Sequence, residues 1–294
     1  AEVGEWNDWR IDQHAQESRK HPYIAVKSRR YLQAIADELA SRPNVELNFG
    51  QAFTQSQAEL VLDSRAQPLP EEGLKQHFLG WHITYDEAKF THGEAVLMDF
   101  IASAPDPCTF LYVLPFTDGS ALVELTCFSE KVWDQEAYKP LLRQEIESRF
   151  GTGYRILQTE QAVLPMSPLR KRDKQRHIHI GQPGGWMRPS SSYSFGKSLQ
   201  MADRLAPAII QGHNLANYKA YPWHLRMMDN IFLSVLSRHP DKAPDLFRAL
   251  GRGVSGGRFA RFMVGEPTFS DIRNIMMALP KGLFLSAVAR GGFL

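Results

Sequence analysis

Cysteine and long apolar runs are scarce in this chain. Only Cys108 and Cys127 are cysteines among its 294 residues, too few for a disulfide framework or a cysteine-rich zinc site, and this favours a reducing compartment. No apolar run reaches the roughly 18 residues of a membrane-spanning helix, and neither a signal peptide nor an internal repeat is visible. The formal net charge of +2 argues against a general nucleic-acid-binding protein.

A dinucleotide-binding fingerprint is also missing. No Gly-x-Gly-x-x-Gly follows an early strand, and the glycine-rich run 251–257 has no strand before it, so we interpret it as a loop. The chain starts at Ala1 without a methionine, and we expect the polar residues 1–20 to be a loop or an extension. With 43% hydrophobic and 22% charged residues, the composition is that of a globular protein of one large domain or two.

Two kinds of periodicity alternate along the chain. Residues 20–66 combine strand-like Tyr23–Val26, a helix that starts at Ser28 and ends before Pro43, and strand-like Val45–Phe49 and Leu60–Asp63. From residue 78 the apolar period changes to two, and the chain is mostly helical after Phe195. This order predicts an α/β cofactor domain interrupted by an antiparallel sheet that forms one wall of a pocket. The strands expected in this sheet are Phe78–Thr84, Ala95–Phe100, Phe110–Pro115, Ala121–Phe128 and Ile156–Leu164, with a helix at Trp133–Phe150 before the last.

A glycine turn follows the predicted strand Arg176–Ile180. Gly184 and Gly185 leave the backbone bare for a flat ligand, and serines then precede an apolar helix that starts near Phe195. Serine oxygens and a helix start attract phosphate, so the segment suits a flavin. A turn that caps a helix and binds nothing remains an equal alternative.

Two acidic residues interrupt apolar strands. Glu124 shares a strand face with Leu122 and Thr126, and burial on a cavity wall would raise its pKa and keep a proton available. Asp99 follows Met98 in a second apolar strand, where aspartate is disfavoured. A solvated face for Glu124 and a strand-end turn for Asp99 are the alternatives. Paired acids in different environments can divide proton donation from cation stabilisation.

Three further polar features are open to interpretation. His177 and His179 alternate in one strand, but we identify no third metal ligand at a suitable spacing and predict no metal site. Asp63 and Arg65 close a strand, where they could contact a ribityl chain or a phosphate, or simply form a turn. Residues 242–294 carry eight Lys or Arg and three Asp or Glu among many aromatic residues, typical of a surface helix at an anionic membrane or of helices packed on the body.

In family order and spacing, these residues resemble the bacterial lycopene β-cyclases. No single motif carries the resemblance, which extends over nearly the whole chain. The matching elements are residues 6–38, Asp63 with Arg65, residues 78–81, Met98 with Asp99, residues 112–116, Glu124 with Thr126, Glu160 with residues 164–166, the run from Gly181 through Gly184, Gly185, Pro189 and Ser192 to Tyr193, and Arg261, Phe262, Gly265 and Asp271.

The chain departs from the family pattern at several positions. Leu125 stands where a second acid usually follows the glutamate, Arg188 replaces a common histidine, and Ser192 and Ala66 replace glycines. The family's amino-terminal βαβ unit, which holds the ADP half of the flavin, has no counterpart here, so we expect a truncated, partial or diverged chain.

The resemblance implies a fold and an activity. The fold is α/β (α+β), a hydroxylase-type FAD/NAD(P)-binding flavoprotein with residues 1–72 and 166–210 in a partial FAD-binding domain, 73–165 in a β-rich substrate domain and 211–294 in a helical, membrane-associating region. The activity is non-redox cyclisation of lycopene or a related linear carotene. Glu124 would act as the acid or cation-stabilising carboxylate with Asp99 in support.

The resemblance also implies a cofactor and a location. Reduced FAD, with NAD(P)H as reductant, would be held by Gly181, Gly184, Gly185, Pro189, Ser192, Tyr193, Asp63 and Arg65. The protein would be cytoplasmic and peripheral to the membrane, with Phe284 and Phe293 near lipid. The alternatives are an FAD-dependent monooxygenase or reductase on the same scaffold, and an inactive carotenoid-binding fragment.

Overall fold

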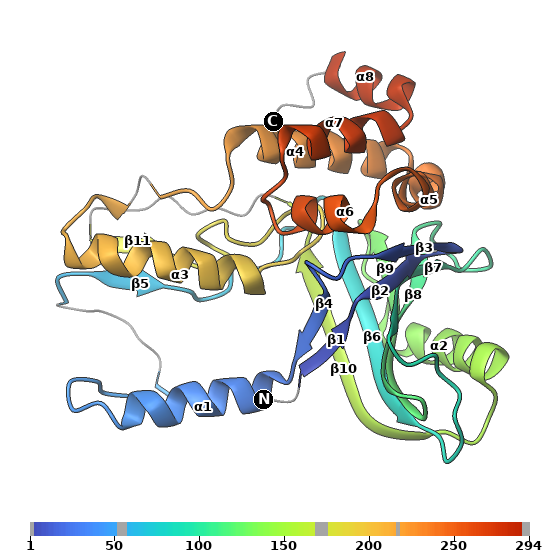
Figure 1. Cartoon of the computed structure of the whole chain (residues 1–294), viewed down its shortest axis with the longest axis horizontal. Helices are drawn as coiled ribbons and strands as arrows, with labels where there is room; N and C mark the ends of the chain where they lie inside the picture. Colours follow the sequence, from blue (N-terminus) through green and yellow to red (C-terminus); the bar gives the residue numbers. More distant parts are fainter. Residues whose placement is uncertain (1–2, 52–57, 168–175, 216–217, 290–294) are drawn as a thin grey trace.

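A large sheet organises the molecule (Figure 1). The computed structural model of the chain describes residues 3–51, 58–167, 176–215 and 218–289. Seven strands form the sheet in the order β10-β6-β9-β8-β7-β2-β3, and all neighbours are antiparallel except β2 and β7. The strands are β2 (Asp8–Ile11), β3 (His14–Glu17), β6 (Lys75–Thr84), β7 (Glu94–Phe100), β8 (Thr109–Thr117), β9 (Ser120–Ser129) and β10 (Arg155–Pro165).

The five strands β6 to β10 confirm the antiparallel sheet that the period-two pattern predicts. Alternate residues of each strand point to opposite faces, and one face packs against helix α2 (Gln135–Phe150). Asp134 caps this helix by accepting from the backbone N–H of Glu136 at 3.3 Å. On this helix Leu142 and Ile146 are fully buried. They belong to one core cluster with Val123 and other odd-numbered residues of β6, β8 and β9.

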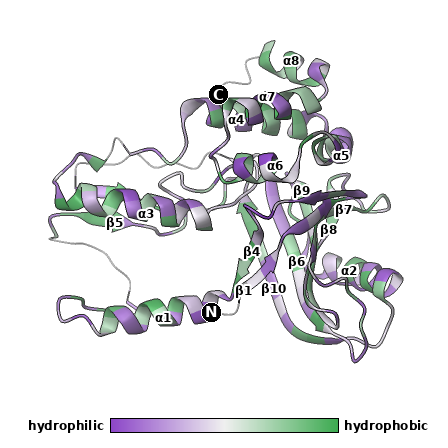
Figure 2. Ribbon diagram, in the orientation of Figure 1, coloured by the Kyte–Doolittle hydropathy of each residue, from purple (hydrophilic) through white to green (hydrophobic). Residues whose placement is uncertain are grey.

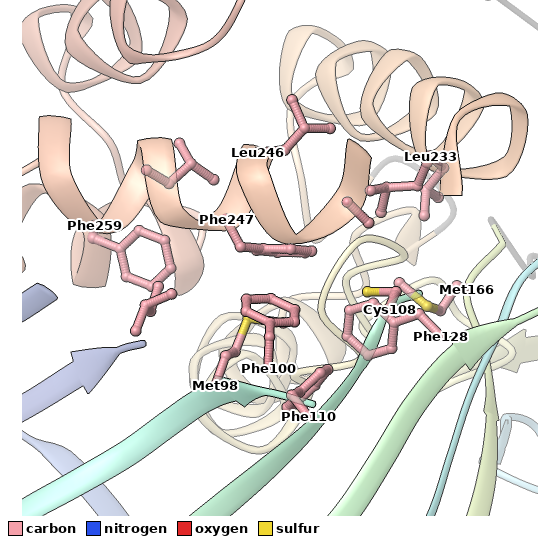
Figure 3. Packing of buried hydrophobic residues seen from close by; sticks show 14 of the residues in the cluster. Met98, Phe100, Cys108, Phe110, Phe128, Met166, Leu233, Leu246, Phe247 and Phe259 are labelled. Atoms are coloured by element: carbon pink, nitrogen blue, oxygen red, sulfur yellow. The ribbon is translucent and has the colours of Figure 1, made fainter. Parts of the chain in front are cut away.

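The other face of the sheet meets the carboxyl-terminal helices. These are α4 (Trp223–Arg238), α5 (Ala243–Gly253), α6 (Gly256–Met263), α7 (Phe269–Ala278) and α8 (Lys281–Ala289). Phe247 of α5 contacts Phe100 and Phe128, with ring centroids 6.1 and 6.0 Å apart (Figure 3). The aromatic residues of this basic segment therefore contribute to a core.

The expectation of a loop at residues 1–20 was wrong. Residues 3–6 form β1 (Val3–Trp6), which pairs with the predicted strand β4 (Tyr23–Val26), while β2 and β3 join the edge of the large sheet. Trp6 and Trp9 are buried, and the indole N–H of Trp6 donates to the carbonyl of Pro115 at 3.0 Å. The segment is polar in composition, but burial of its two tryptophans stabilises it as strands. Residues 8–17, which we predicted in the FAD-binding part, therefore extend the large sheet.

A separate group of elements carries the predicted cofactor region. Helix α1 (Ser28–Ala40) lies away from the large sheet, whereas β11 (His177–His179) pairs in parallel with β5 (Val61–Asp63) beside helix α3 (Phe195–Ile210) (Figure 1). Residues 45–49, predicted as a strand, are not in one, because no neighbouring strand pairs with them among the described residues. The glycine run 251–257 is also no simple loop, since it ends α5 and begins α6.

Helix α8 is coloured mostly as hydrophobic, whereas α7 carries both hydrophobic and hydrophilic residues (Figure 2). Within residues 3–51, 58–167, 176–215 and 218–289, no single helix is both long and apolar enough to cross a bilayer. Taken together, α7 and α8 satisfy that test of length and composition, with a bend of 104° between them. Phe293 lies outside the described residues.

Candidate active site

Four residues form a row across the large sheet. The strand register places Glu160 of β10 opposite Gly80 of β6, Gly80 opposite Glu124 of β9, and Glu124 opposite Tyr112 of β8. They lie on the face turned away from α2, because Val123 and Leu125 occupy that other face. A β-carbon at Gly80 would lie 2.8 Å from Cγ of Glu124 and 3.1 Å from Cγ of Glu160. Glycine at this position therefore gives both carboxyl side chains room over one point of the sheet.

Glu124 is buried, with 9% of its surface exposed. Its removal from water disfavours the charged form and raises the pKa of its carboxyl well above the ordinary value, and the hydrogen bond and like charge of Glu160 act in the same direction. A carboxyl in this position holds its proton more tightly than an exposed glutamate does. The alternative of a solvated strand face for Glu124 is excluded.

Three tyrosine hydroxyls gather beside the carboxyl pair. Tyr112 donates to the hydroxyl of Tyr23 of β4 at 2.7 Å, and Tyr193, which precedes α3, donates to the same oxygen at 3.2 Å. Burial is the main cause that raises the pKa of Tyr112 and of Tyr23, so both hydroxyls remain neutral. The hydroxyl chain connects the sheet to the segment after the glycine turn.

Both carboxyls line a large apolar cavity. Its volume is about 2010 Å³, above the roughly 300–1,000 Å³ of ordinary ligand pockets. It runs from the sheet face to helices α4 to α8, and also reaches α1 and the start of α3. Its apolar walls include Leu114, Leu122, Phe128, Met227, Phe232, Phe259, Phe262, Ile275 and Phe284. The arrangement can present a protonated carboxyl to a long hydrocarbon.

The structure does not bring Asp99 to this site. Asp99 lies opposite Leu111 on the α2 face of the sheet, where Arg149 of α2 donates to its carboxylate at 3.2 Å. Arg10 lies 3.9 Å from the same carboxylate. The expected supporting role is thus corrected, because strand alternation turns Asp99 away from the cavity. Its place beside Glu124 is taken by Glu160.

Contrary to our prediction for Gly184 and Gly185, the glycine turn does not present a bare backbone surface to the cavity. Gly181 and Gly185 have φ of +61° and +72°, the left-handed region that glycine adopts at little cost. A β-carbon at Gly184 would lie 2.3 Å from the carbonyl oxygen of His179. Gly184 is therefore required for the turn to fold back on β11, and its open side faces backbone rather than the cavity.

The serine segment after the turn reaches the cavity. Ser190, Ser191 and Tyr193 line it, whereas Pro189 is buried just before them. Ser192 has φ of +57°, and its hydroxyl is buried without a hydrogen-bond partner. A buried hydroxyl without a partner costs stability unless a ligand satisfies it, and serine here occupies a glycine-like conformation. These features fit a polar cofactor held between this segment and the start of α3.

Asp63 and Arg65 form an internal ion pair. The Asp63 carboxylate accepts from the backbone and side chain of Arg65 at 3.0, 2.9 and 2.6 Å, which lowers the pKa of Asp63 far below its usual value. His177 also bonds to it at 3.0 Å. The ligand atoms of Asp63, His177 and His179 lie within 4.8 Å of one another, so Asp63 is the residue that could complete a three-ligand group with the two histidines. The guanidinium of Arg65 already occupies the carboxylate and disfavours a cation there, so we assign a hydrogen-bonded network.

Two features of the site escaped sequence reasoning. Tyr23 and Tyr112 are 89 residues apart, and nothing in their local pattern joins them. Glu160 carries a signal that could have been used, because a glycine inside strand β6 indicates a close approach of neighbours, and Gly80 is that glycine.

Solved structures of similar fold define the class of the protein. A flavoprotein/dehydrogenase from Cytophaga hutchinsonii matches with a TM-score of 0.59 and 11% identity, covering 98% of this chain and 83% of that one. A geranylgeranyl bacteriochlorophyll reductase-like protein from Thermoplasma acidophilum matches with a TM-score of 0.55 and 12% identity, covering 97% and 83%. The chain has the fold of FAD-dependent flavoproteins.

Family comparison then gives the particular group. The family described as lycopene cyclase protein matches residues 10–285, and the chain belongs to this family. Neoxanthin synthase of Solanum lycopersicum is 26% identical over 145 residues, which are 44% of this chain and 28% of that protein, and the Solanum tuberosum enzyme matches equally. The chain thus spans under a third of the length of these two relatives.

Proposed function

We propose that this protein cyclises the ends of a linear carotene, lycopene or a close relative, to rings of the β-carotene type. The observation that carries the proposal is the buried Glu124, whose pKa is raised by burial, at the wall of an apolar cavity of about 2010 Å³. An alkene is a very weak base, so its protonation needs an acid that is kept dry and aimed. Glu124 is buried and lines the cavity, which supports both conditions.

The reaction begins with proton transfer from Glu124 to the terminal trisubstituted alkene. The tertiary carbocation that results is attacked by the neighbouring double bond, which closes a six-membered ring, and loss of a ring proton completes the isomerisation. One proton enters and one leaves, so the substrate is neither oxidised nor reduced. Asp99 takes no part, since it is paired with Arg149 on the other face of the sheet.

Aromatic rings beside the acid support a cationic intermediate. Tyr23, Tyr112 and Tyr193 all line the cavity with Glu124. The electron-rich face of an aromatic ring attracts a cation, by about 0.5–1 kcal/mol when exposed and by about 2 kcal/mol or more when desolvated. The hydroxyl chain fixes the orientation of the three rings.

The cofactor of the proposed reaction is FAD. Ser190, Ser191, Ser192 and Tyr193 would hold it near the start of α3, where backbone N–H groups attract phosphate, with Asp63 and Arg65 at the end of β5. Bound in its reduced form, kept so by NAD(P)H that the net reaction does not consume, the flavin would supply negative charge that stabilises the cation. The orphan hydroxyl of Ser192 supports this assignment.

The carboxyl-terminal helices suit contact with a membrane surface, where a carotene dissolves. Phe269, Met276 and Met277 of α7 and Leu285 of α8 are largely exposed and also line the cavity, beside Lys281. Apolar side chains at an opening, together with a cation, favour binding to anionic lipid. We therefore propose a cytoplasmic protein that is peripheral to the membrane, with Phe284 near this opening.

The test compares Glu124→Gln with the wild-type protein on lycopene in vesicles, with FAD and NAD(P)H, by chromatography of the carotenes. We expect a loss of at least about 100-fold, the usual contribution of a general acid, with bound flavin retained. Glu94→Gln, at a carboxylate of the same sheet that pairs with Arg10 at 3.3 Å, is the matched control and should remain active.

Two results would contradict the proposal. Ring formation by Glu124→Gln at the wild-type rate would remove Glu124 from its role. Consumption of NAD(P)H in proportion to product would instead indicate a monooxygenase or reductase, because cyclisation needs only catalytic amounts of reductant.

A further inference from the structure

The two cavity carboxyls are placed to share one proton. Gly80 lies between Glu124 and Glu160 in the sheet register, and a β-carbon there would be 3.2 Å from Oε1 of Glu124 and within 3.1 Å of Cγ of Glu160. Both side chains line the apolar cavity. Two carboxylates this close in an apolar setting cannot both ionise readily, so the pair retains a proton that a lone exposed glutamate would lose.

We propose that Glu160 is a positioning residue that shares this proton with Glu124 across Gly80 and holds Glu124 in its protonated form. The proposal deepens the proposed cyclisation and rests on it. When the O–H bond of Glu124 breaks and a C–H bond forms on the alkene, the pair becomes fully ionised. Loss of the ring proton then returns one proton to the pair, and no oxidant or reductant is needed.

The charged and titratable groups around the pair come from several elements. Tyr112 of β8, Tyr23 of β4 and Tyr193 before α3 face Glu124 with neutral hydroxyls. On the Glu160 side lies His82 of β6, whose pKa is lowered mainly by burial and also by Lys27. Lys27 thus acts on His82, on which the charge of Glu160 has the opposite effect. The hydrogen bond between the two carboxyls is the contact that orients the acid.

Infrared titration of carboxyl groups tests the sharing directly, without requiring turnover. We compare the whole wild-type protein, Glu160→Gln, Glu124→Gln and the control Glu94→Gln, and follow the band of protonated carboxyl against pH. The wild type and the control should retain a protonated carboxyl at neutral pH that Glu124→Gln lacks. In Glu160→Gln the like charge is gone, so Glu124 should lose its proton at least about one pH unit lower.

Activity supplies the second measurement. The alkaline limb of the pH–rate profile for cyclisation should move to lower pH by the same amount in Glu160→Gln, whereas a merely structural defect would lower the rate equally at all pH values. Gly80→Ala forces the carboxyls apart without removing either. It should also move the infrared titration midpoint and the alkaline limb of the pH–rate profile to lower pH.

An unchanged titration midpoint in Glu160→Gln, with the fold intact by circular dichroism, overturns the proposal that the two glutamates share a proton. If the wild-type protein does not cyclise carotenes at all, the proposed function fails, but the infrared titration still decides whether the two glutamates share a proton. The two failures are thus distinguishable.

Discussion

The large sheet with its helices and the α1–β5–β11–α3 region differ in how far their helices are buried. Helix α2 buries Tyr138, Leu142 and Ile146 almost completely against the sheet. Helix α1 has a clear apolar face but no buried residue, and its Leu32 is 61% exposed. An amphipathic pattern therefore specifies which face of a helix can be buried, while the partner that buries it comes from elsewhere.

One buried ion pair ties the two regions together. Arg188, after the glycine turn, donates to Asp229 of α4 at 3.0–3.2 Å, and both side chains are at most 5% exposed. The largest predicted effect comes from Arg188→Met, which leaves the Asp229 charge buried and should lower the free energy of unfolding by about 3–5 kcal/mol. Denaturant unfolding measures it, and the double variant with Asp229→Asn should recover part of the loss. A loss from Arg188→Met below about 1 kcal/mol would show that the two regions are held independently.

The contrast between α2 and α1 is tested by matched substitutions. Leu142→Ala opens a cavity in the packed core and should cost about 2–5 kcal/mol. Leu32→Ala, on the uncovered face of α1, should change the free energy of unfolding by no more than about 0.5 kcal/mol. Thermal or denaturant unfolding compares them. Equal losses would mean that α1 is covered as fully as α2 in solution.

A buried histidine makes the contact between α2 and the sheet dependent on pH. His77 bonds to Ser129 at 2.9 Å and to the Tyr138 hydroxyl of α2 at 2.6 Å, and burial lowers its pKa to about 4. Between pH 6.5 and 4 the unfolded chain binds a proton that the folded chain does not. Stability is therefore complete above pH 6.5 and falls as the pH decreases, by about 2 kcal/mol at pH 5 from this group.

The measurement is the difference in unfolding free energy between pH 7 and pH 5. In His77→Gln this difference should shrink by that amount relative to the wild type, because the titrating group is gone. An identical pH dependence in both proteins would assign the acid sensitivity to other residues.

The smallest predicted effect concerns the serine segment. Ser192 holds φ of +57°, and Ser192→Gly should relieve backbone strain and remove the orphan hydroxyl, raising stability by about 0.5–1 kcal/mol without cofactor. Because the Ser192 hydroxyl is assigned to the flavin, the same change should weaken flavin binding, as measured by fluorescence quenching. Unchanged or tighter binding would contradict a contact between this hydroxyl and the flavin.

Local periodicity predicted the central sheet because strands β6 to β9 carry alternating apolar residues, and β10 follows as a further strand-like segment. It could not predict that β2 pairs in parallel with β7, since Trp9 and Ala95 lie far apart in the chain. The same distinction applies to the site. The burial of Glu124 could be predicted from its apolar strand. The hydrogen bond between His177 and Asp63, which are 114 residues apart, could not, because only the fold brings them together. Asp99 was misassigned because strand composition alone does not say which face lines a cavity.

The alternation of β9 between two environments has a consequence for its tolerance of mutation. Val123 and Leu125 pack under α2, while Leu122, Glu124 and Thr126 face the cavity. A saturation library across this strand should show effects that alternate from one position to the next. Substitutions at odd positions should reduce the amount of folded protein. Substitutions at even positions should leave that amount unchanged but alter turnover and product pattern. Neighbouring codons would thus be under different kinds of selection.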